Sequence, residues 1–274
     1  MRPKTIGCVT AASLVFCGAV AARAADLPAA PVYKAPAAVA AYNWSGFYIG
    51  GNAGYGWGNA ADNTAFNDPT FPVTDVHANH DRLRGALGGV QAGYNWQSSD
   101  HGVFGIEADW QYAHQTGGQG FTDAFLNPPQ SFDTITSSAQ SEIRWFGTIR
   151  ARAGFSSESL LFYATGGFAY GAVKRSGTIN ENLTTPGFTF TGNTTFNVSR
   201  VNAGWTLGGG VEGKLAGNWT WKAEYLYLDL GSVSALMPAD TPPSGIAVSG
   251  ASTLSVHGRF TDNIARLGVN LRLN

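Results

Sequence analysis

Charged side chains recur at every second position in several segments of this chain, which is the spacing of residues that share one face of a β-strand. Residues 103–112, VFGIEADWQY, carry Glu107 and Asp109 on one such face, and residues 142–155, EIRWFGTIRARAGF, carry three arginines on one face. Burying this many charged groups without partners is strongly unfavourable. We therefore expect the acids of one segment to lie opposite the arginines of the next. We predict a structural network of interior ion pairs, with a gating or conducting role as the alternative. The predicted lumen network comprises Glu107, Asp109, Arg144, Arg150, Arg152, Glu212, Lys222, Glu224, Arg266 and Arg272.

Histidines are the other residues whose spacing could support chemistry. The segment DVHANHD holds His77 and His80 three positions apart, a pair that could ligate a metal ion or heme. In a loop this spacing imposes no geometry, so we expect a solvent-exposed polar loop, with ligand binding as the alternative. The chain has no GxSxG, HExxH or phosphate-binding-loop motif, and we expect no enzyme, no catalytic residue and no cofactor. A catalytic site at an outer rim would have to use His77, His80, Asp81, His114 or His257, with Asp75 and Asp123 near them in sequence.

The elements that must position these residues are predicted to be strands. The chain is rich in glycine and aromatic residues, only 13% of its residues are charged, and no apolar stretch of helical membrane-spanning length follows residue 25. Aromatic and aliphatic residues alternate with glycine or polar residues, which is typical of a sheet with one wet face. Eight segments show this period of two or a continuous apolar run: residues 46–58, 88–97, 103–112, 142–155, 160–173, 200–213, 218–231 and 263–274.

The connections between these segments alternate in length. Short connections are expected at 98–102, 156–159 and 213–218, and long loops at about 58–81, 113–140, 174–199 and 231–260. Short periplasmic turns and long external loops are the layout of outer-membrane barrels. We therefore predict an all-β protein that forms a closed, antiparallel, eight-stranded transmembrane up-and-down barrel, with both termini in the periplasm. Its apolar face would meet lipid, and its aromatic girdles would include Trp57, Trp96, Trp110, Trp219 and Tyr227.

The first 43 residues have a different composition from the rest. Arg2 and Lys4 precede an apolar run that ends in Ala22-Arg23-Ala24, a pattern that predicts a cleaved signal peptide over residues 1–24. Residues 25–43 are rich in alanine and proline and are predicted to form a periplasmic tether, leaving 44–274 as the barrel. The only cysteines, Cys8 and Cys17, lie in the leader, so the mature chain would hold no thiol. A formal charge of −1 without a clustered basic face argues against binding to nucleic acid.

Several of these segments together resemble a known family. The opening WSGFYIGGNAGYGWG, the pair GGVQAGYNWQ and VFGIEADWQY, then TIRARAGF, LFYATGGFAYG, EYLYLDLG and the closing RLGVNLRLN look like the small outer-membrane β-barrels that include outer membrane immunogenic proteins. The resemblance implies a barrel similar to the membrane domain of outer membrane protein A, with a lumen filled by side chains. Such proteins act mainly at the surface or in envelope stability, and some relatives bind heme or host ligands. Members usually end on an aromatic residue, whereas Leu273 stands at that position here, so recognition by the barrel assembly machinery is expected to be weaker.

These observations predict an integral outer-membrane barrel of a Gram-negative envelope with a structural or surface-interaction role. Its expected partners are outer-membrane lipid, the barrel assembly machinery and an extracellular ligand bound through the long loops. One alternative is a small-solute porin, which glycines on the polar strand faces would favour. A further alternative is a heme or metal receptor that uses the loop histidines His77 and His80. The glycines in question are Gly50, Gly54, Gly208 and Gly210.

Overall fold

The computed structural model describes residues 42–67, 74–98, 101–127, 131–238 and 253–273. The predicted signal peptide and residues 25–41 of the predicted tether lie outside the described residues. Among the described residues, no helix has the length and apolarity needed to cross a membrane.

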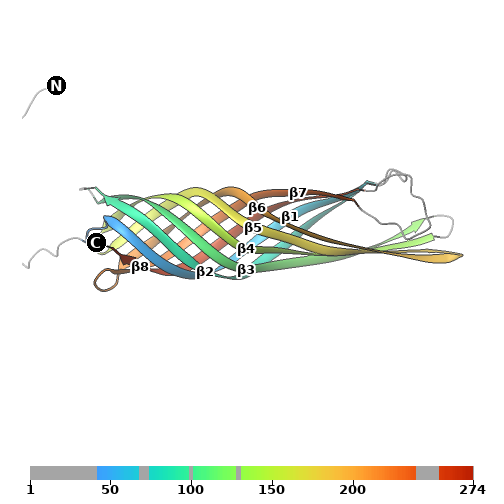
Figure 1. Ribbon diagram of the computed structural model, residues 1–274, viewed down its shortest axis with the longest axis horizontal. Coiled ribbons are helices and arrows are strands. Elements are labelled where there is room, and N and C mark those ends of the chain that lie inside the picture. Colours follow the sequence, from blue (N-terminus) through green and yellow to red (C-terminus); the bar gives the residue numbers. More distant parts are fainter. Residues whose placement is uncertain (1–41, 68–73, 99–100, 128–130, 239–252, 274) are drawn as a thin grey trace, which may run out of the picture. The chain divides into compact units, whose positions relative to one another are not determined.

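Eight antiparallel strands form one closed barrel (Figure 1). Each strand pairs with the next along the chain, and β8 pairs with β1 from Tyr48↔Arg272 to Asn67↔Thr253. Closure satisfies the backbone groups of every strand within the barrel, which is what a membrane-embedded sheet requires. The predicted all-β, eight-stranded, up-and-down barrel is therefore confirmed. The strands are β1 (Gly46–Asn67), β2 (Thr74–Gln97), β3 (Gly102–Asn127), β4 (Ser131–Ser157), β5 (Leu160–Thr185), β6 (Phe188–Lys214), β7 (Trp219–Pro238) and β8 (Thr253–Arg272).

The strands are about twice as long as the sequence pattern predicted. Segments expected to be long loops are largely strand, and β5 and β6, for example, are joined by a turn at residues 186–187. These segments carry polar residues on both faces, so they lack the alternation of apolar and polar residues by which a strand is recognised. Their pairing is supported by cross-strand contacts between polar side chains, such as Ser138 with Thr178 at 2.8 Å and Asn193 with Asn180 at 2.6 Å. The prediction of long loops in these regions is wrong for most of their residues.

Two of the eight strand pairings end partway along the strands, so the barrel is closed over only part of its length. The pairing of β2 with β3 ends at Arg84↔Thr116, and the pairing of β6 with β7 ends at Trp205↔Asp229. The pairing of β3 with β4, in contrast, continues to Asn127↔Ser131. Beyond the closed section, the strands therefore continue as two four-stranded sheets, β7-β8-β1-β2 and β3-β4-β5-β6. We call this part the extension; it lies at the right of Figure 1.

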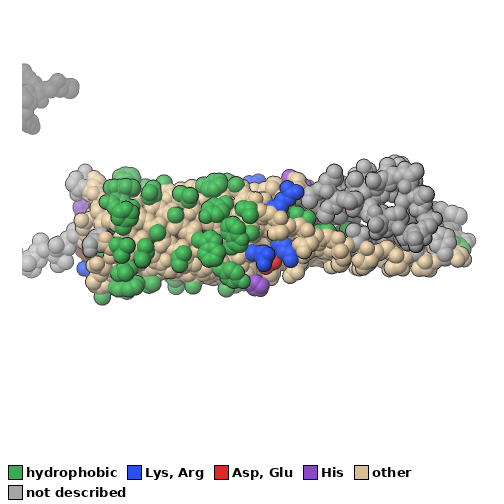
Figure 2. Space-filling model, viewed as in Figure 1, with side chains coloured by type: hydrophobic (Ala, Val, Ile, Leu, Met, Phe, Trp, Pro, Cys, Tyr) green, Lys and Arg blue, Asp and Glu red, His purple; other side chains and the backbone are tan. Residues whose placement is uncertain are grey.

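The closed section is apolar outside and polar inside. Outward side chains such as Phe47 (62% exposed) and Leu267 (68% exposed) alternate with buried Gln91 and Glu107 on the inner face. Figure 2 shows the hydrophobic side chains spread over the outside of the closed section. Water-soluble barrels have the opposite arrangement, so this surface fits a lipid environment.

Candidate functional site

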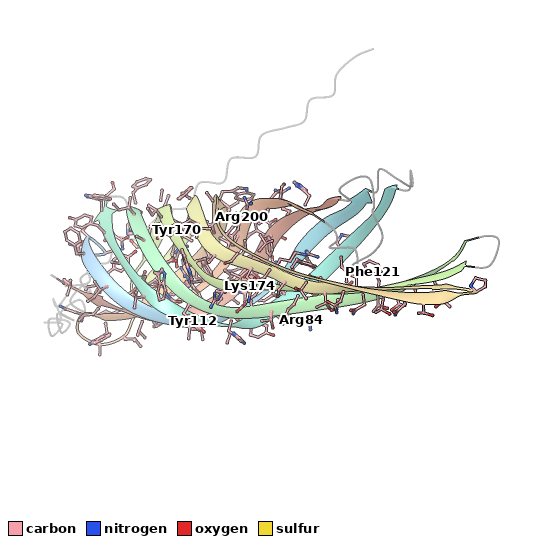
Figure 3. The ribbon with its side chains drawn as sticks, turned by 45° about the vertical axis from the view of Figure 1, so that its right-hand side comes forward. Arg84, Tyr112, Phe121, Tyr170, Lys174 and Arg200 are labelled. Carbon is pink, nitrogen blue, oxygen red and sulfur yellow. The ribbon has the colours of Figure 1, made fainter. Side chains whose placement is uncertain are left out.

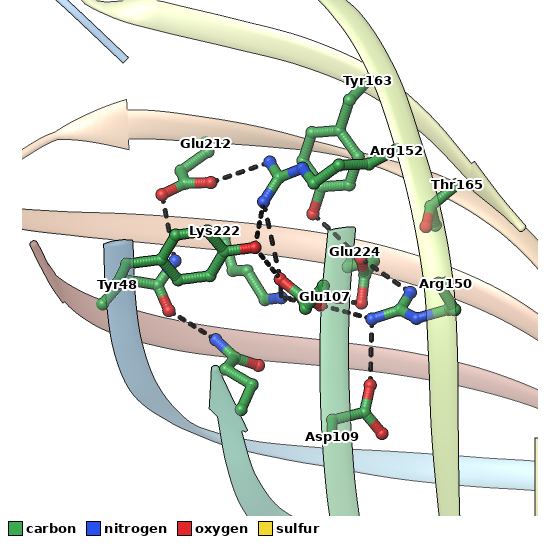
Figure 4. A network of polar contacts seen from close by, with 12 residues as sticks. Tyr48, Glu107, Asp109, Arg150, Arg152, Tyr163, Thr165, Glu212, Lys222 and Glu224 are labelled. Carbon is green, nitrogen blue, oxygen red and sulfur yellow. Dashed lines mark hydrogen bonds and ion pairs between the residues drawn. The ribbon is translucent and has the colours of Figure 1, made fainter. Parts of the chain in front are cut away.

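A cluster of charged side chains occupies the middle of the barrel interior (Figure 4). It contains four carboxylates and four cationic groups, and each of these side chains is at most 2% exposed. The two kinds of charge balance within the cluster. We call it the interior charge cluster; its members are Glu107, Asp109, Arg150, Arg152, Glu212, Lys222, Glu224 and Arg266.

Strand register brings opposite charges together. Glu107 on β3 lies opposite Arg150 on β4, and two further cross-strand pairs are Glu212↔Lys222 and Glu224↔Arg266. Directly opposed residues have their Cβ atoms only about 5 Å apart. The alternation of charges along the sequence therefore builds the cluster as soon as the sheet closes in this register.

Arg150 is central to the cluster. Its Nη1 lies 3.1 Å from Glu224 Oε1, its Nη2 lies 2.9 Å from Asp109 Oδ2, and the same nitrogen contacts Glu107. Arg266 reinforces this arrangement from the opposite side, because its Nε donates to Glu224 at 2.6 Å and its Nη2 to Asp109 at 3.0 Å. Asp109 and Glu224 are thus each shared between Arg150 and Arg266.

Glu107 is the acceptor at the other end of the cluster. Lys222 Nζ lies 2.9 and 3.0 Å from its two carboxylate oxygens, and the Tyr48 hydroxyl donates to it at 2.7 Å. Arg152 then links Tyr48 to Glu212 through hydrogen bonds of 2.9 Å to each. The Arg152 guanidinium also stacks 4.0 Å from the ring centroid of Tyr163. The cluster is therefore continuous from β1 to β8.

Two members of this network were not identified from the sequence. Tyr48 alternates with the outward Phe47 and Ile49, so the period of two places it on the inner face, but its hydroxyl partner cannot be read from spacing. Tyr163 lies in the continuous apolar run of residues 160–173, where the sequence does not distinguish the inner from the outer face, and its hydroxyl donates to Glu224 at 3.0 Å. For Tyr48 the alternation along its strand was the available signal, whereas residues 160–173 offer no comparable signal for Tyr163.

Packed apolar side chains lie on both sides of the charge cluster. Toward the short turns, Trp44 packs with Val103, Leu161 and Tyr163. Toward the extension, a larger group of fully buried or nearly buried residues fills the interior. The interior is therefore filled at three successive levels. The larger group includes Leu83, Leu87, Ile143, Phe146, Leu226, Leu228, Leu230, Phe260 and Ile264.

Arg272 occupies a separate position. Its guanidinium donates to the backbone carbonyls of Asn43 and Ser45 and lies 4.9 Å from the ring centroid of Tyr42. The Tyr42 ring in turn contacts Trp44 edge to face at 4.8 Å. Tyr42 and Asn43, which we assigned to the tether, therefore pack against the end of the barrel, and Arg272 holds that segment in place.

The prediction that Arg144 belongs to the lumen network is wrong. Its side chain is 57% exposed on the outside of the barrel, 3.9 Å from Glu142. The cause is a bulge in β4, where Ile143 pairs with Val173 and Trp145 with Ala172, so that Arg144 is an extra residue. An inserted residue reverses the inward and outward alternation, and the sequence pattern gives no sign of it.

The predicted girdle residues lie on the outer surface. Trp96 and Trp219 are about half exposed near the short turns, at 51% and 48%. Trp57 and Trp110 are exposed to 41% and 46% near the other end of the closed section, where Tyr227 is partly buried. The Trp57 and Tyr225 rings lie 6.2 Å apart between centroids, so β1 and β7, which flank β8, contribute to the same aromatic level.

The two histidines of the predicted ligand pair lie on strand β2, not in a loop. The backbone of His77 pairs with Thr64 and that of His80 with Ala61. Positions three apart on a regular strand belong to opposite faces of a sheet, an arrangement that does not favour two ligands for one ion. Within the described part of the chain, no group of three or more histidine, cysteine, aspartate or glutamate residues is placed to hold a metal ion. His114 and His257 are exposed on different strands.

The amino-acid sequence matches a known protein family over most of its length. Residues 11–272 match the family model described as outer membrane protein beta-barrel domain. The chain belongs to this family. A similar relative is the 31 kDa outer-membrane immunogenic protein of Brucella melitensis biotype 1, which is 37% identical over 233 residues covering 81% of this chain and 87% of the relative. The 22 kDa outer membrane protein of Rhizobium leguminosarum bv. viciae is 29% identical over 69% of this chain and 66% of the relative.

Solved structures that match this chain are distant from it in sequence. Neisserial surface protein A covers 84% of this chain and 98% of its own, with 14% identity and a TM-score of 0.33. The assignment of the fold therefore rests on the strand pairing described above. Family membership and an apolar exterior together identify an outer-membrane β-barrel protein.

Proposed function

We propose that this outer-membrane barrel is closed to solutes and serves to hold the extension at the cell surface, where it contacts extracellular or host molecules. The observation that carries the proposal is the filled interior, in which a balanced charge cluster lies between two apolar layers. A closed interior has no use as a conduit, whereas the closed section can anchor a surface structure in the membrane. Proteins of this family in Brucella are named immunogenic, which fits exposure at the surface.

The atoms that surround the four glycines do not support the porin alternative. A Cβ on Gly50 would lie 2.1 Å from Asn270 Oδ1, and one on Gly210 would lie 2.7 Å from the Tyr163 hydroxyl. The space beside Gly50 and Gly210 is therefore occupied by a polar side chain from another strand, and the space beside Gly54 and Gly208 by the side chains of Arg266 and Leu226. We infer that these glycines make room for interior side chains. Neither the porin nor the heme-receptor alternative gains support from the described residues.

Proteoliposome swelling tests the closed lumen. Liposomes that contain the refolded mature protein are placed in an isotonic solution of a small neutral sugar, and turbidity is followed. We expect swelling no faster than in empty liposomes. Swelling that scales with the amount of folded protein would reverse the proposal in favour of a small-solute porin.

The orientation is the second part of the proposal. We infer that the short turns and both chain termini face the periplasm and that the extension faces outward, as in other outer-membrane barrels. Cysteine introduced at Asn193, on the exposed extension, should react with a membrane-impermeant maleimide in intact cells. Cysteine at Glu158, in a short turn, is the matched control and should react only after the outer membrane is opened. The reverse pattern would overturn the orientation.

The same orientation implies how the protein reaches the membrane. We propose delivery by the predicted signal peptide and insertion by the barrel assembly machinery, which reads the end of the last strand. Leu273 replaces the aromatic residue usual there, so L273F should increase the amount of assembled barrel in cells. Equal amounts of folded L273F and wild-type protein would argue against a weakened signal. We also propose that the protein has no enzymatic activity, consistent with the structural role of the interior charges.

A further inference from the structure

Positively charged side chains gather where the closed section meets the extension. Arg82 and Arg84 on β2 are exposed, the Arg144 side chain on β4 is 57% exposed, and Lys174 on β5 is partly exposed. Figure 2 shows Lys and Arg side chains at this boundary, immediately beside the hydrophobic surface. In Figure 3, Arg84 and Lys174 lie farther toward the extension than Tyr112 and Tyr170. We call Arg82, Arg84, Arg144 and Lys174 the basic belt.

The basic belt directly adjoins the aromatic level of the barrel. Arg84 is the register partner of Trp57, and Arg144 precedes Trp145, whose ring lies 6.0 Å from that of Tyr170. Aromatic side chains of membrane proteins favour the boundary between hydrocarbon and headgroups. The basic belt therefore lies at the headgroup level of the leaflet that borders the extension.

The strand register places the belt on one continuous surface. A single row runs from Arg84 through Thr116 and Glu142 to Lys174. Neighbouring strands are about 4.8 Å apart, so the ends of this row are separated by about 14 Å. That span is suited to a ligand with more than one anionic group.

Among the described side chains, the four cations of the belt are accompanied by one carboxylate, that of Glu142, which is also the register partner of Lys174. Glu142 lies in the same row, 3.9 Å from Arg144, but among the described side chains neither Arg82 nor Arg84 forms an ion pair. By contrast, the exposed Arg259 on β8 is occupied by a contact with Asp229. The belt on β2, β4 and β5 is thus available to bind an anion.

Beyond the belt, the same face of the extension is polar and uncharged. The next row joins Gln140, Ser176 and Asn197, and the row after it joins Ser138, Thr178 and Thr195. These two rows line a shallow hollow. Hydroxyl and amide groups without charge are suited to hydrogen bonding with sugars.

We propose that this face binds a phosphorylated glycolipid of the outer leaflet. Going outward along the strands, apolar, basic and uncharged polar surfaces follow one another, which matches the order of acyl chains, phosphates and sugar in such a lipid. The basic belt binds the phosphates, the apolar surface meets the acyl chains, and the hydroxyl-bearing rows contact the sugar. The placement in the outer leaflet rests on the orientation given under Proposed function.

Binding of purified bisphosphorylated lipid A to the full mature barrel in detergent tests the proposal, read as retained lipid by native mass spectrometry. The triple variant R84Q/R144Q/K174Q should bind at least about 10-fold more weakly than wild type, because three charges near the phosphates are lost. The charge-preserving triple variant R84K/R144K/K174R is the matched control and should remain within a few-fold of wild type. All three proteins are first shown to be folded by their heat-modifiable mobility on a gel.

Two comparisons with the wild-type protein do not depend on the variants. Lipid A from which both phosphates have been removed should bind at least about 10-fold more weakly, and phosphatidylglycerol should bind more weakly than lipid A. Equal binding of the glutamine variant, of dephosphorylated lipid A or of phosphatidylglycerol would overturn the proposal. Because binding is measured in detergent, its failure is distinct from failure of the orientation, which maleimide labelling reports, and from solute leakage, which liposome swelling reports.

Discussion

Arg150 on β4 and Glu107 on β3 are direct cross-strand partners, and their side chains touch in the centre of the barrel with exposures of 0% and 2%. Neither charge could be held there alone, since an unpaired charge in an apolar surrounding is strongly unfavourable. Both are shared with other groups, because Arg150 also contacts Asp109 and Glu224. This pair shows that the charges in the strand sequences serve to fill the interior.

Replacing Arg150 by alanine should destabilise the folded barrel by about 3–5 kcal/mol, because three carboxylates lose a shared cation. The matched control is R144A on the same strand, whose exposed side chain should cost no more than about 0.5 kcal/mol. Urea unfolding in lipid vesicles, followed by tryptophan fluorescence, measures both. Equal stabilities of R150A and R144A would refute the structural role of the cluster. The double variant R150A/R152A should be less stable still.

Glu107 and Lys222 should be energetically coupled. Lys222 Nζ lies 2.9 and 3.0 Å from the two carboxylate oxygens of Glu107. Either single variant, E107Q or K222M, therefore leaves a buried charge without one of its partners. We expect the double variant to lose less unfolding free energy than the sum of the losses of the two single variants, by about 0.5–3 kcal/mol. Unfolding free energies of wild type, both single variants and the double variant complete the cycle. Strict additivity would show that the contact contributes nothing specific.

The apolar layer toward the extension should also contribute to stability. Phe146 is fully buried there, so F146A should cost about 3–5 kcal/mol through loss of contacts and the cavity left behind. Phe47 is 62% exposed on the outer surface and provides the control of equal chemistry. F47A should be clearly less destabilising in the same unfolding assay. A larger effect for F47A would place the main packing of the protein at the lipid face.

Sequence periodicity predicted the barrel because its strands bury one polar face and expose one apolar face throughout the closed section. The same rule failed where that contrast ends. Beyond Thr116 on β3 and Glu142 on β4, polar residues occur on both faces, so the continuing strands resembled loops in the sequence. Only backbone pairing distinguishes the two cases, and it depends on partners far away in sequence.

Other features depended on single irregularities that no pattern reveals. The extra residue in β4 turned Arg144 outward while Arg150 and Arg152 remained inside. Trp44, the first residue of the predicted barrel, precedes the first strand and is fully buried at the short-turn end beside Val103 and Leu161, which no periodicity indicated. Spacing in the sequence could assign the charged residues to one face of the strands. Their ion-pair partners depend on the stagger between neighbouring strands in the closed barrel, which spacing does not give.

Single-channel recording of the refolded mature protein in a planar bilayer tests the central claim, a closed interior, most directly. Heat-modifiable gel mobility first establishes that the inserted protein is folded. We predict a silent membrane, because the charge cluster around Arg150 lies between two packed apolar layers. Reproducible conductance steps whose size or ion selectivity changes in E107Q would contradict the account and make the interior charges a conducting path.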